Sequence, residues 1–393
     1  MPSKTQAAHS TLEESRLPVS LLTGFLGSGK TTILNFLLQH PGMSKTAVII
    51  NEFGAIGLDH ELIEHTEEDT VLLQSGCICC TVRGDLIATL SDLLRRRACG
   101  EVSTFARVVI ETTGLADPAP ILHTLMTAPE IATRFRLDGV LATVDAATGN
   151  ATLDRQPEAT KQAAVADRIL LTKTDIASPS DVAGLRDRLR RLNPAAPILV
   201  AENGIVSPES LFNAGPYNPE TKSPDVRQWL NAEAYQSPSP PLSGSGAPGR
   251  LPRKPRIEPS LHPHDPNRHD DRIRAICLVE DEPIDGSAFV SWLESLVLLK
   301  GQDLLRVKGI INIAGLKAPL VIHGVQHVFH PPVKLRKWPG RDRRSKLVFI
   351  VRDLEESTLR DSLKRFIHAA RGETRWTRVE DQLDDIIMYE LKQ

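Results

Sequence analysis

Residues 24–31 read GFLGSGKT, and they follow a short apolar run at residues 19–22. The octet fits the pattern G-x-x-x-x-G-K-[ST], and Leu34, Leu37 and Leu38 predict a helix directly after it. A strand, a glycine-rich turn and a helix in this order let backbone N–H groups surround phosphate oxygens. The sequence therefore predicts a nucleotide site at this turn.

The residue types of this turn predict how a nucleotide is held. Lys30 is expected to reach the β- and γ-phosphates, and the Thr31 hydroxyl is expected to ligate Mg²⁺. A glycine-rich turn without a ligand has no need of this Lys-Thr pair. The expected nucleotide-binding residues of the turn are Gly24, Gly27, Ser28, Gly29, Lys30, Thr31 and Thr32.

A second nucleotide signal lies at residues 170–175, LLTKTD, which end another predicted strand and fit the pattern [NT]-K-x-D. The Asp175 carboxylate can accept hydrogen bonds from N1–H and from the exocyclic amino group of guanine, whereas adenine presents a lone pair at N1. Lys173 is expected to lie along the base, next to Thr172. The motif predicts GTP rather than ATP, although a bare T-K-x-D also occurs as a polar strand end.

Residues 107–114, RVVIETTG, form an apolar strand that ends in an acid. Glu111 is expected close to Mg²⁺ or to the attacking water. Gly114 is expected to offer its N–H to the γ-phosphate and to act as a hinge. With Lys30 these are the predicted catalytic residues; the alternative for Glu111 is a carboxylate that caps the strand.

Thiols are concentrated at residues 76–80, GCICC. This C-x-C-C is not a zinc-finger spacing, but its density favours a thiolate site for Zn²⁺ or a neighbouring metal. Cys77 and Cys79 face one side of an extended segment, and a turn can bring Cys80 round. A redox pair and small buried residues are the alternatives.

Further ligands are needed to complete such a metal site. Glu52 is the main candidate, with His60, His65 or a partner protein as others. Cys99 and Cys277 are isolated, and we expect both to be packing residues.

Apolar strand-like runs alternate with helical stretches between residues 17 and 200. Strands are expected at 19–23, 46–51, 70–74, 107–111, 139–144, 168–172 and 197–201. Helices are expected near 30–39, 84–97, 118–128, 158–165 and 179–192. This alternation predicts an α/β, P-loop NTPase fold, a mostly parallel sheet with helices on both faces and ligands at the carboxyl ends of its strands.

Composition divides the chain into three parts. Residues 17–235 are expected to form the nucleotide domain with the C-x-C-C motif, and 273–393 a small α+β domain. Residues 236–272 are rich in Pro, Ser and Gly, which predicts a disordered linker. Its histidines, with the neighbouring Asp265, Asp270 and Asp271, are either a weak metal-collecting tract or a solvated polar segment; they are His262, His264 and His269.

In the last domain, helices are expected near 286–299 and 355–370, and strands near 304–313, 319–330 and 346–352. The three neighbouring histidines at 323, 327 and 330 are expected to be structural rather than metal ligands. The basic run from Lys334 to Lys346 is expected to be a solvated hairpin.

Charge and hydropathy exclude several function classes for this chain of 393 residues. The net charge is −2, which gives no electrostatic case for binding nucleic acid or an anionic membrane. No apolar run approaches the roughly 20 residues of a membrane span, and the N-terminus has no apolar signal core. Three of five cysteines lie within residues 77–80, which favours metal or redox chemistry in a cytoplasmic protein.

Together these residues resemble the CobW-type branch of the P-loop GTPases, a metallochaperone-like family. The matching segments are GFLGSGKTT (24–32), NEFG (51–54), GCICCTVRGDL (76–86), ETTGLADP (111–118), ADRILLTKTD (166–175), RVKGI (306–310), GVQH (324–327) and RRSKLVFI (343–350). The resemblance implies a GTPase domain, a CobW C-terminal domain, and delivery of Zn²⁺ or Co²⁺. Ile50 and Ala55 stand where the family often has Glu, which removes two carboxylates from the expected metal ligands.

The sequence therefore predicts a GTPase, with GTP, Mg²⁺ and Zn²⁺ (or Co²⁺) as cofactors, that couples hydrolysis to delivery of metal to a client metalloprotein. A homodimer is compatible with this function. Two alternatives stay open: a P-loop phosphotransferase acting on a small molecule, and a non-catalytic metal reservoir.

Overall fold

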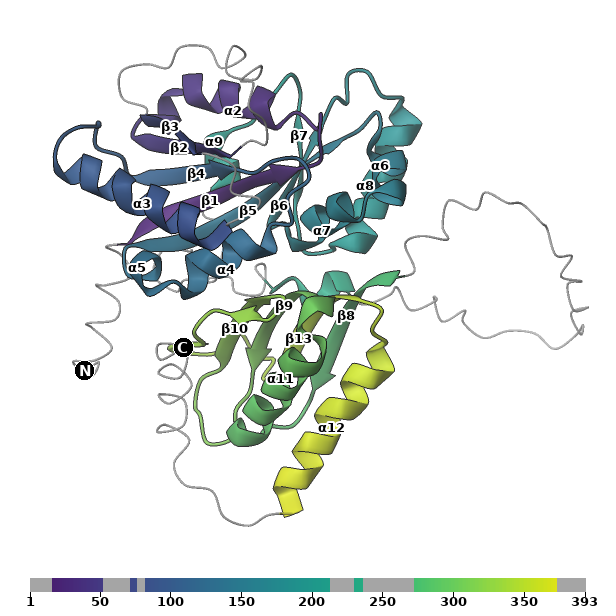
Figure 1. Cartoon of the computed structure of the whole chain (residues 1–393). Helices are drawn as coiled ribbons and strands as arrows, with labels where there is room; N and C mark the ends of the chain where they lie inside the picture. Colours follow the sequence, from purple (N-terminus) through teal and green to yellow (C-terminus); the bar gives the residue numbers. More distant parts are fainter. Residues whose placement is uncertain (1–15, 52–70, 76–81, 213–229, 236–271, 373–393) are drawn as a thin grey trace, which may run out of the picture.

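The computed structural model describes residues 16–51, 71–75, 82–212, 230–235 and 272–372. These residues form an upper unit around a parallel sheet and a lower unit around an antiparallel sheet (Figure 1). Among the described residues, no helix combines the length and the apolar character needed to cross a lipid bilayer.

The first unit is a seven-stranded sheet in the order β3-β2-β4-β1-β5-β6-β7. Every neighbouring pair is parallel. Strands β1, β2, β4, β5 and β6 are mostly apolar and mostly buried, as expected where helices cover both sides of a sheet. The strands of this sheet are β1 (Leu17–Gly24), β2 (Thr46–Asn51), β3 (Val71–Ser75), β4 (Arg107–Glu111), β5 (Phe135–Asp145), β6 (Arg168–Thr172) and β7 (Ile198–Ala201).

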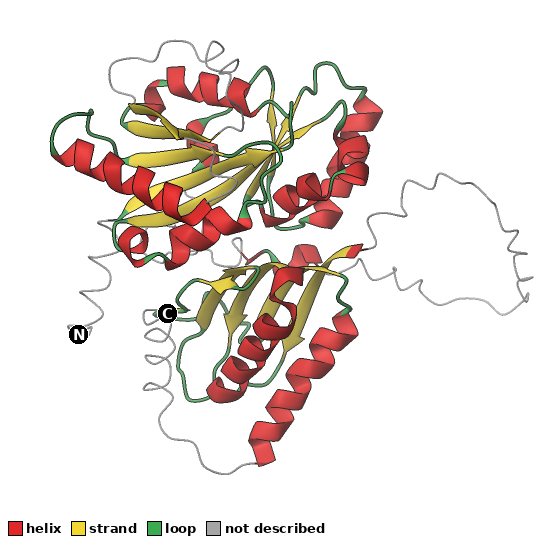
Figure 2. Ribbon diagram, in the orientation of Figure 1, coloured by secondary structure: helices red, strands yellow, loops and turns green. Residues whose placement is uncertain are grey.

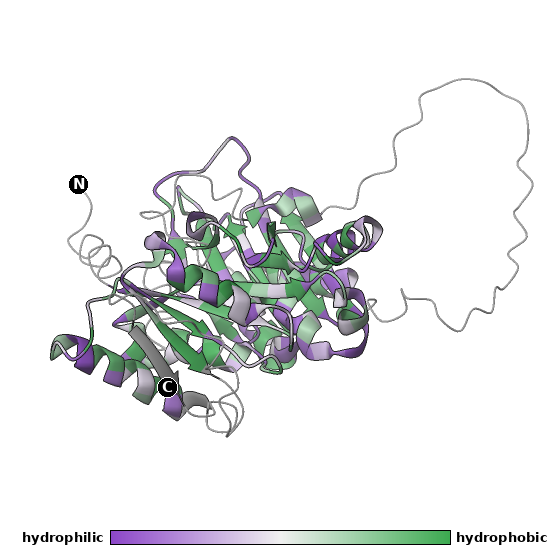
Figure 3. Cartoon of the chain, turned by 90° about the horizontal axis from the view of Figure 1, so that it is seen from above, coloured by the Kyte–Doolittle hydropathy of each residue, from purple (hydrophilic) through white to green (hydrophobic). Residues whose placement is uncertain are grey.

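Helices cover both faces of this sheet (Figure 2). Consecutive residues of β1 separate the two faces, because Leu22 packs with α2 (Lys30–Gln39) and α9 (Pro208–Leu211), whereas Leu21 packs with the helices of the opposite face. Those helices are α3 (Val82–Ala98), α4 (Ala119–Thr127), α7 (Pro157–Val165) and α8 (Pro179–Leu192), and the shorter elements are η1 (Pro41–Met43), α5 (Pro129–Ala132), α6 (Gly149–Arg155) and η3 (Ala232–Tyr235). Seen from above, hydrophobic colour follows the strands and polar colour the outer turns of the helices (Figure 3).

The second unit is an antiparallel sheet in the order β11-β10-β9-β13-β8, with β12 paired to β10. One face is covered by α11 and α12, around the fully buried side chains of Trp292 and Phe349. Trp292 Nε1 donates to Ser362 Oγ at 2.9 Å and so joins the two helices. The elements are β8 (Ile273–Glu280), α11 (Gly286–Lys300), η5 (Gly301–Asp303), β9 (Leu304–Ile311), β10 (Leu320–Val325), β11 (Val328–Phe329), β12 (Val333–Lys334), β13 (Ser345–Arg352) and α12 (Glu356–Gly372).

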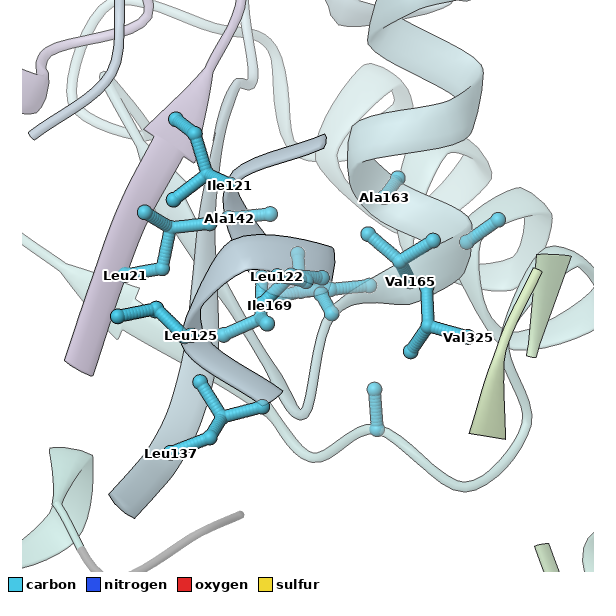
Figure 4. Close-up of a cluster of buried hydrophobic side chains, with 14 of the residues drawn as sticks. Leu21, Ile121, Leu122, Leu125, Leu137, Ala142, Ala163, Val165, Ile169 and Val325 are labelled. Carbon is cyan, nitrogen blue, oxygen red and sulfur yellow. The ribbon is translucent and has the colours of Figure 1, made fainter. Parts of the chain in front are cut away.

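The other face of the antiparallel sheet packs against the first unit. Elements α4, α7, α8 and η3 contact its strands. Figure 4 shows Val325 of β10 beside Val165 of α7, in the cluster that also holds Leu21 of β1. The two units therefore share one apolar core, which fixes the second unit beneath the parallel sheet.

The α/β prediction and its seven strands are confirmed, and several details differ. The strand expected at 319–330 is interrupted, because Gln326 has φ 54° and starts a turn between β10 and β11. Helix α6 was not expected. The basic run 334–346 is not a hairpin, because β12 pairs with β10 while β13 pairs with β8 and β9. Within this run Leu335 is buried and Trp338 packs on the shared core.

Candidate functional site

The carboxyl ends of the parallel strands meet at one edge of the sheet, as the sequence predicts. The registers pair Glu111 with Leu22 and with Ile50, and Asp145 with Thr172. The motif residues that follow β1, β4 and β6 therefore leave the sheet at the same edge. This edge is the candidate functional site.

The glycine-rich turn connects β1 to α2. Gly24, Gly27 and Gly29 all have positive φ, and Gly29 (φ 91°) precedes the first residue of the helix. Lys30 is 8% exposed, and its Nζ donates to the carbonyl oxygens of Gly24 at 2.9 Å and Phe25 at 3.2 Å. The carbonyl oxygens of the turn thus hold the Lys30 ammonium near the start of α2. The N-terminus of a helix carries a partial positive charge, so an anion is favoured at this position.

The T-K-x-D segment contacts the glycine-rich turn directly. Thr172 Oγ1 donates to the Ser28 carbonyl at 2.8 Å, and the Ser28 hydroxyl lies 2.5 Å from Thr143 Oγ1 on β5. Lys173 has φ 55°, and Asp175 is exposed two residues further on. The sequence-predicted phosphate and base residues are therefore joined into one arrangement by buried hydrogen bonds.

The segment from Glu111 to residue 118 lies against the glycine-rich turn. Glu111 is 7% exposed at the end of β4. A Cβ added to Gly114 would lie 2.5 Å from the backbone nitrogen of Leu26, so only glycine allows this close approach. The predicted hinge therefore touches the predicted phosphate turn.

Helix α7 holds this segment from the other side. Gln162 Nε2 donates to the carbonyl oxygens of Gly114 at 3.2 Å and Ala116 at 3.0 Å. Lys161 Nζ pairs with Asp117 at 2.9 Å. Neither Gln162 nor Lys161 could be predicted from the sequence, because only the tertiary fold brings α7 to residues 114–117.

Asp145 is a further site residue that the sequence analysis missed. It ends β5, and its carboxylate pairs with Lys173 Nζ at 2.7 Å. Burial alone would raise the pKa of Asp145, but the hydrogen bonds from Lys173 and from the Ala147 N–H lower it below its ordinary value. A polar residue directly after the expected strand 139–144 was the available signal.

A hollow of about 570 Å³ lies between α8 and β7, beside the T-K-x-D segment. Thr174, Arg186 and Glu202 are among the residues that line it. The predicted nucleotide-binding residues do not line this hollow, so it is a separate feature of the surface.

The predicted transition-metal ligands lie outside the described residues: Glu52, Cys77, Cys79 and Cys80, with His60, His65 and the three linker histidines. The residues before the two ligand segments are described, and Asn51 of β2 is the register partner of Ser75 of β3. Within the described ranges, no group of three or more His, Cys, Asp or Glu side chains forms a metal site.

The isolated cysteines differ from each other. Cys277 is half-buried and packs on the shared core, whereas Cys99 is exposed just after α3. The prediction that Cys99 packs in the interior is wrong, because Cys99 lies in the exposed turn just past the end of α3.

The C-terminal histidines are in ring contacts. The rings of His323 and His330 stack with centroids 5.2 Å apart, and His327 contacts His123 of α4 at 5.3 Å. The second pair joins the two units of the fold.

The parallel sheet, the glycine-rich turn and the T-K-x-D segment held against it define a P-loop nucleotide-binding protein. Residues 18–200 match the CobW/HypB/UreG nucleotide-binding domain, and residues 273–367 match the cobalamin synthesis protein cobW C-terminal domain. The chain belongs to the CobW family, which confirms the resemblance seen in its motifs.

Named relatives extend over most of the chain. It is 34% identical to zinc chaperone YjiA of Escherichia coli, over 88% of this chain and 96% of that protein. It is 27% identical to zinc-regulated GTPase metalloprotein activator 1 of Dictyostelium discoideum, over 85% and 76% respectively. The crystal structure of Zn(II)-bound YjiA GTPase from E. coli superposes with a TM-score of 0.64 at 30% identity, covering 89% of this chain and 99% of that one.

Proposed function

We propose that this protein is a GTPase that binds Zn²⁺ (or Co²⁺) and uses GTP hydrolysis to pass the metal to a client metalloprotein. The observation that carries the proposal is the hydrogen bond from Thr172 Oγ1 to the Ser28 carbonyl, which joins a guanine motif to a phosphate turn. The family match over both units and the relatives named zinc chaperone or metalloprotein activator support it.

The donor groups at the phosphate turn fit Mg²⁺. Thr31 is half-exposed, in the first turn of α2 directly after Lys30. Glu111 supplies a carboxylate at the same edge of the sheet, and Mg²⁺ prefers such oxygen ligands. Thr31 and Glu111 would hold the ion, which supplies charge neutralisation at the phosphates when bound.

The protein's own residues then position the reacting phosphate. Lys30 Nζ, now on two carbonyl oxygens of the turn, is close to where the β- and γ-phosphates are expected, and the N–H groups at the start of α2 face the same position. The Gly114 N–H is expected to meet the γ-phosphate, and Gln162 fixes the segment that carries it. Loss of the γ-phosphate would release this segment.

The metal to be delivered is expected at Cys77, Cys79 and Cys80 with Glu52. The two ligand segments begin directly after Asn51 and Ser75, which are register partners on adjacent strands. Strand β2 in turn pairs with β4, which ends at Glu111. A change at residues 111–118 can therefore reach the metal ligands through adjacent strands.

Residues 236–272 are proposed as the linker between domains at 17–235 and 273–393. The matched ranges 18–200 and 273–367 support this division.

The test is a Zn²⁺ or Co²⁺ titration by chelator competition with GTP, with GDP and without nucleotide. A difference of about 5- to 150-fold between the GTP and GDP states is expected, because coupling free energies are typically 1–3 kcal/mol. Cys79→Ser/Cys80→Ser should lose the metal, whereas the matched control Cys99→Ser/Cys277→Ser should keep it. The affinity should rise with pH across neutrality, because metal displaces protons from thiols.

Other results would point to the alternatives. Equal metal affinity in all nucleotide states would indicate a passive reservoir. Metal binding that survives the Cys79/Cys80 substitutions would place the ligands elsewhere, for example among the linker histidines. A phosphotransferase would pass the γ-phosphate to a small molecule rather than to water, so release of inorganic phosphate from GTP with no added acceptor would argue against it.

A further inference from the structure

The end of β5 carries a carboxylate that the P-loop motifs do not include. Asp145 is 7% exposed and accepts from the Ala147 N–H at 2.7 Å, the Thr148 N–H at 3.3 Å and the Thr148 hydroxyl at 3.2 Å. The fourth donor group is Lys173 Nζ at 2.7 Å. Three contacts fold the turn before α6 around the carboxylate, and the fourth reaches across to the T-K-x-D segment.

Lys173 needs such a partner to hold one conformation. Its side chain is 39% exposed, so without an anchor the long stem would sample many rotamers. Its backbone is already fixed with φ 55°, next to Thr172, whose hydroxyl is bonded to Ser28. The ion pair with Asp145 fixes the other end of the side chain. Both ends of Lys173 are therefore held before a nucleotide arrives.

We propose that Asp145 is a positioning residue for the nucleotide base: it anchors the Lys173 ammonium so that the methylene stem lies ready along the face of the purine. This rests on the proposed guanine site. Asp145 acts through Lys173 and touches no nucleotide atom itself. Preorganisation of this kind raises affinity by removing an ordering cost from the binding step.

The position of the stem predicts a distinctive specificity. A stem along the ring face contacts any purine of the same shape, whereas Asp175 reads the edge of guanine. Loss of the Asp145 anchor should therefore reduce the affinities for GTP, GDP and inosine triphosphate (ITP) by one common factor. Loss of Asp175 should instead reduce the preference for guanine over hypoxanthine, which lacks the exocyclic amino group.

The competing explanation is that Asp145 only shapes the turn before α6. Asp145→Asn separates the two roles, because Oδ1 can still accept from Ala147 and Thr148 while the charge that holds Lys173 is removed. Lys173→Met removes the ammonium but keeps an unbranched stem. The matched control is Asp154→Asn, since Asp154 pairs with Arg188 at 2.7 Å between α6 and α8, with side chains 27% and 9% exposed.

The experiment is calorimetric titration of the full-length protein with GDP, Mg²⁺·GTP and Mg²⁺·ITP. Asp145→Asn and Lys173→Met should each reduce the affinity for all three nucleotides by roughly tenfold, which corresponds to the loss of one charge-assisted hydrogen bond. The double variant should be no weaker than either single variant, because both changes remove the same interaction. Asp154→Asn should bind like the wild type, and in turnover assays the Asp145→Asn defect should appear in KM.

Several results would overturn the positioning role. Wild-type GDP affinity in Asp145→Asn would show that the anchor does not matter. Additive losses in the double variant, or a changed ratio of GTP to ITP affinity in Asp145→Asn, would show that Asp145 does not act through Lys173. A wild-type protein that does not prefer GTP over ATP would instead refute the guanine site itself. Melting curves confirm that each variant is folded.

Discussion

Arg306 of β9 is paired with Asp167, the residue directly before β6, and their side chains are only 3% and 2% exposed. The Arg306 guanidinium also donates to the Val165 carbonyl at the end of α7, and Lys308 lies 3.6 Å from the same carboxylate. Asp167 in turn accepts from the Val140 N–H at 3.1 Å. A buried charge cluster therefore joins the two units within a largely apolar seam.

We expect Asp167→Ala to destabilise the protein by about 3–5 kcal/mol, because two buried cations lose their counter-charge. Urea denaturation with fluorescence detection measures the loss. The control is Glu101→Gln, which removes an exposed partner of Arg95 at 2.8 Å and should cost less than about 1 kcal/mol. Similar losses in the two variants would mean that the buried pair is not a main support of the seam.

Gly114→Ala should lower the hydrolysis rate by about 10²-fold, because the added methyl group would push residues 111–118 or the phosphate turn out of the geometry that hydrolysis needs. The Cβ would meet the Leu26 backbone nitrogen at 2.5 Å and its Cα at 2.8 Å, and neither atom can rotate away. Phosphate release from saturating Mg²⁺·GTP measures the effect.

The control for this substitution is Gly184→Ala, in the exposed interior of α8, where an added Cβ meets no atom within 4 Å. It should keep full activity and gain roughly 0.5–1 kcal/mol of stability from helix propensity. Unchanged turnover in Gly114→Ala would show that residues 111–118 need not touch the phosphate turn during hydrolysis.

Lys30→Ala should reduce hydrolysis by at least about 10²-fold, since it removes a preorganised positive charge from the phosphate site. It also removes the donor for the Gly24 and Phe25 carbonyl oxygens, so a small drop in melting temperature is expected. Lys317→Ala, which removes an exposed lysine from the second unit, is the control. If Lys30→Ala turns over GTP at the wild-type rate, the measured activity belongs to another site or protein.

The strands of the first unit could be predicted because each contains a short apolar run that ends near turn residues. Strands β2, β4 and β6 begin and end where the sequence indicates. Strand β5 instead begins at Phe135 rather than at residue 139, because Phe135 pairs with Leu17 of β1. The break at Gln326 escaped prediction for a similar reason, since its N–H donates to the Leu304 carbonyl of a distant strand.

The phosphate turn was predictable because its chemistry needs consecutive residues. Residues whose role depends on a partner far along the chain were not: Gln162 acts on Gly114, and Asp145 acts on Lys173. RVKGI was recognised as a family segment, yet nothing in the sequence shows that its arginine and lysine meet Asp167. The predicted roles of Glu52 and the C-x-C-C cysteines stay predictions.

His330, directly after β11, should make stability depend on pH. Burial lowers its pKa to about 4; Asp167 opposes this and Arg16 adds to it. Its ring is stacked on His323, and its Nε2 has no hydrogen-bond partner among the described residues. An imidazolium would therefore be poorly accommodated here, whereas the unfolded chain takes up a proton near pH 6.5.

The sign of the effect follows from which state binds more protons. Between about pH 6.5 and pH 4, His330 is protonated in the unfolded chain but neutral in the folded chain. The free energy of unfolding therefore falls as the pH is lowered through this window. The loss is up to about 3 kcal/mol and is complete near pH 4.

His330→Phe keeps a ring at the site but removes the titration, so its stability should fall less over the same range. His368→Gln, exposed on α12, is the control and should follow the wild type. Parallel pH profiles for wild type and His330→Phe, measured by urea denaturation from pH 7 to pH 4, would show that His330 does not govern the acid sensitivity.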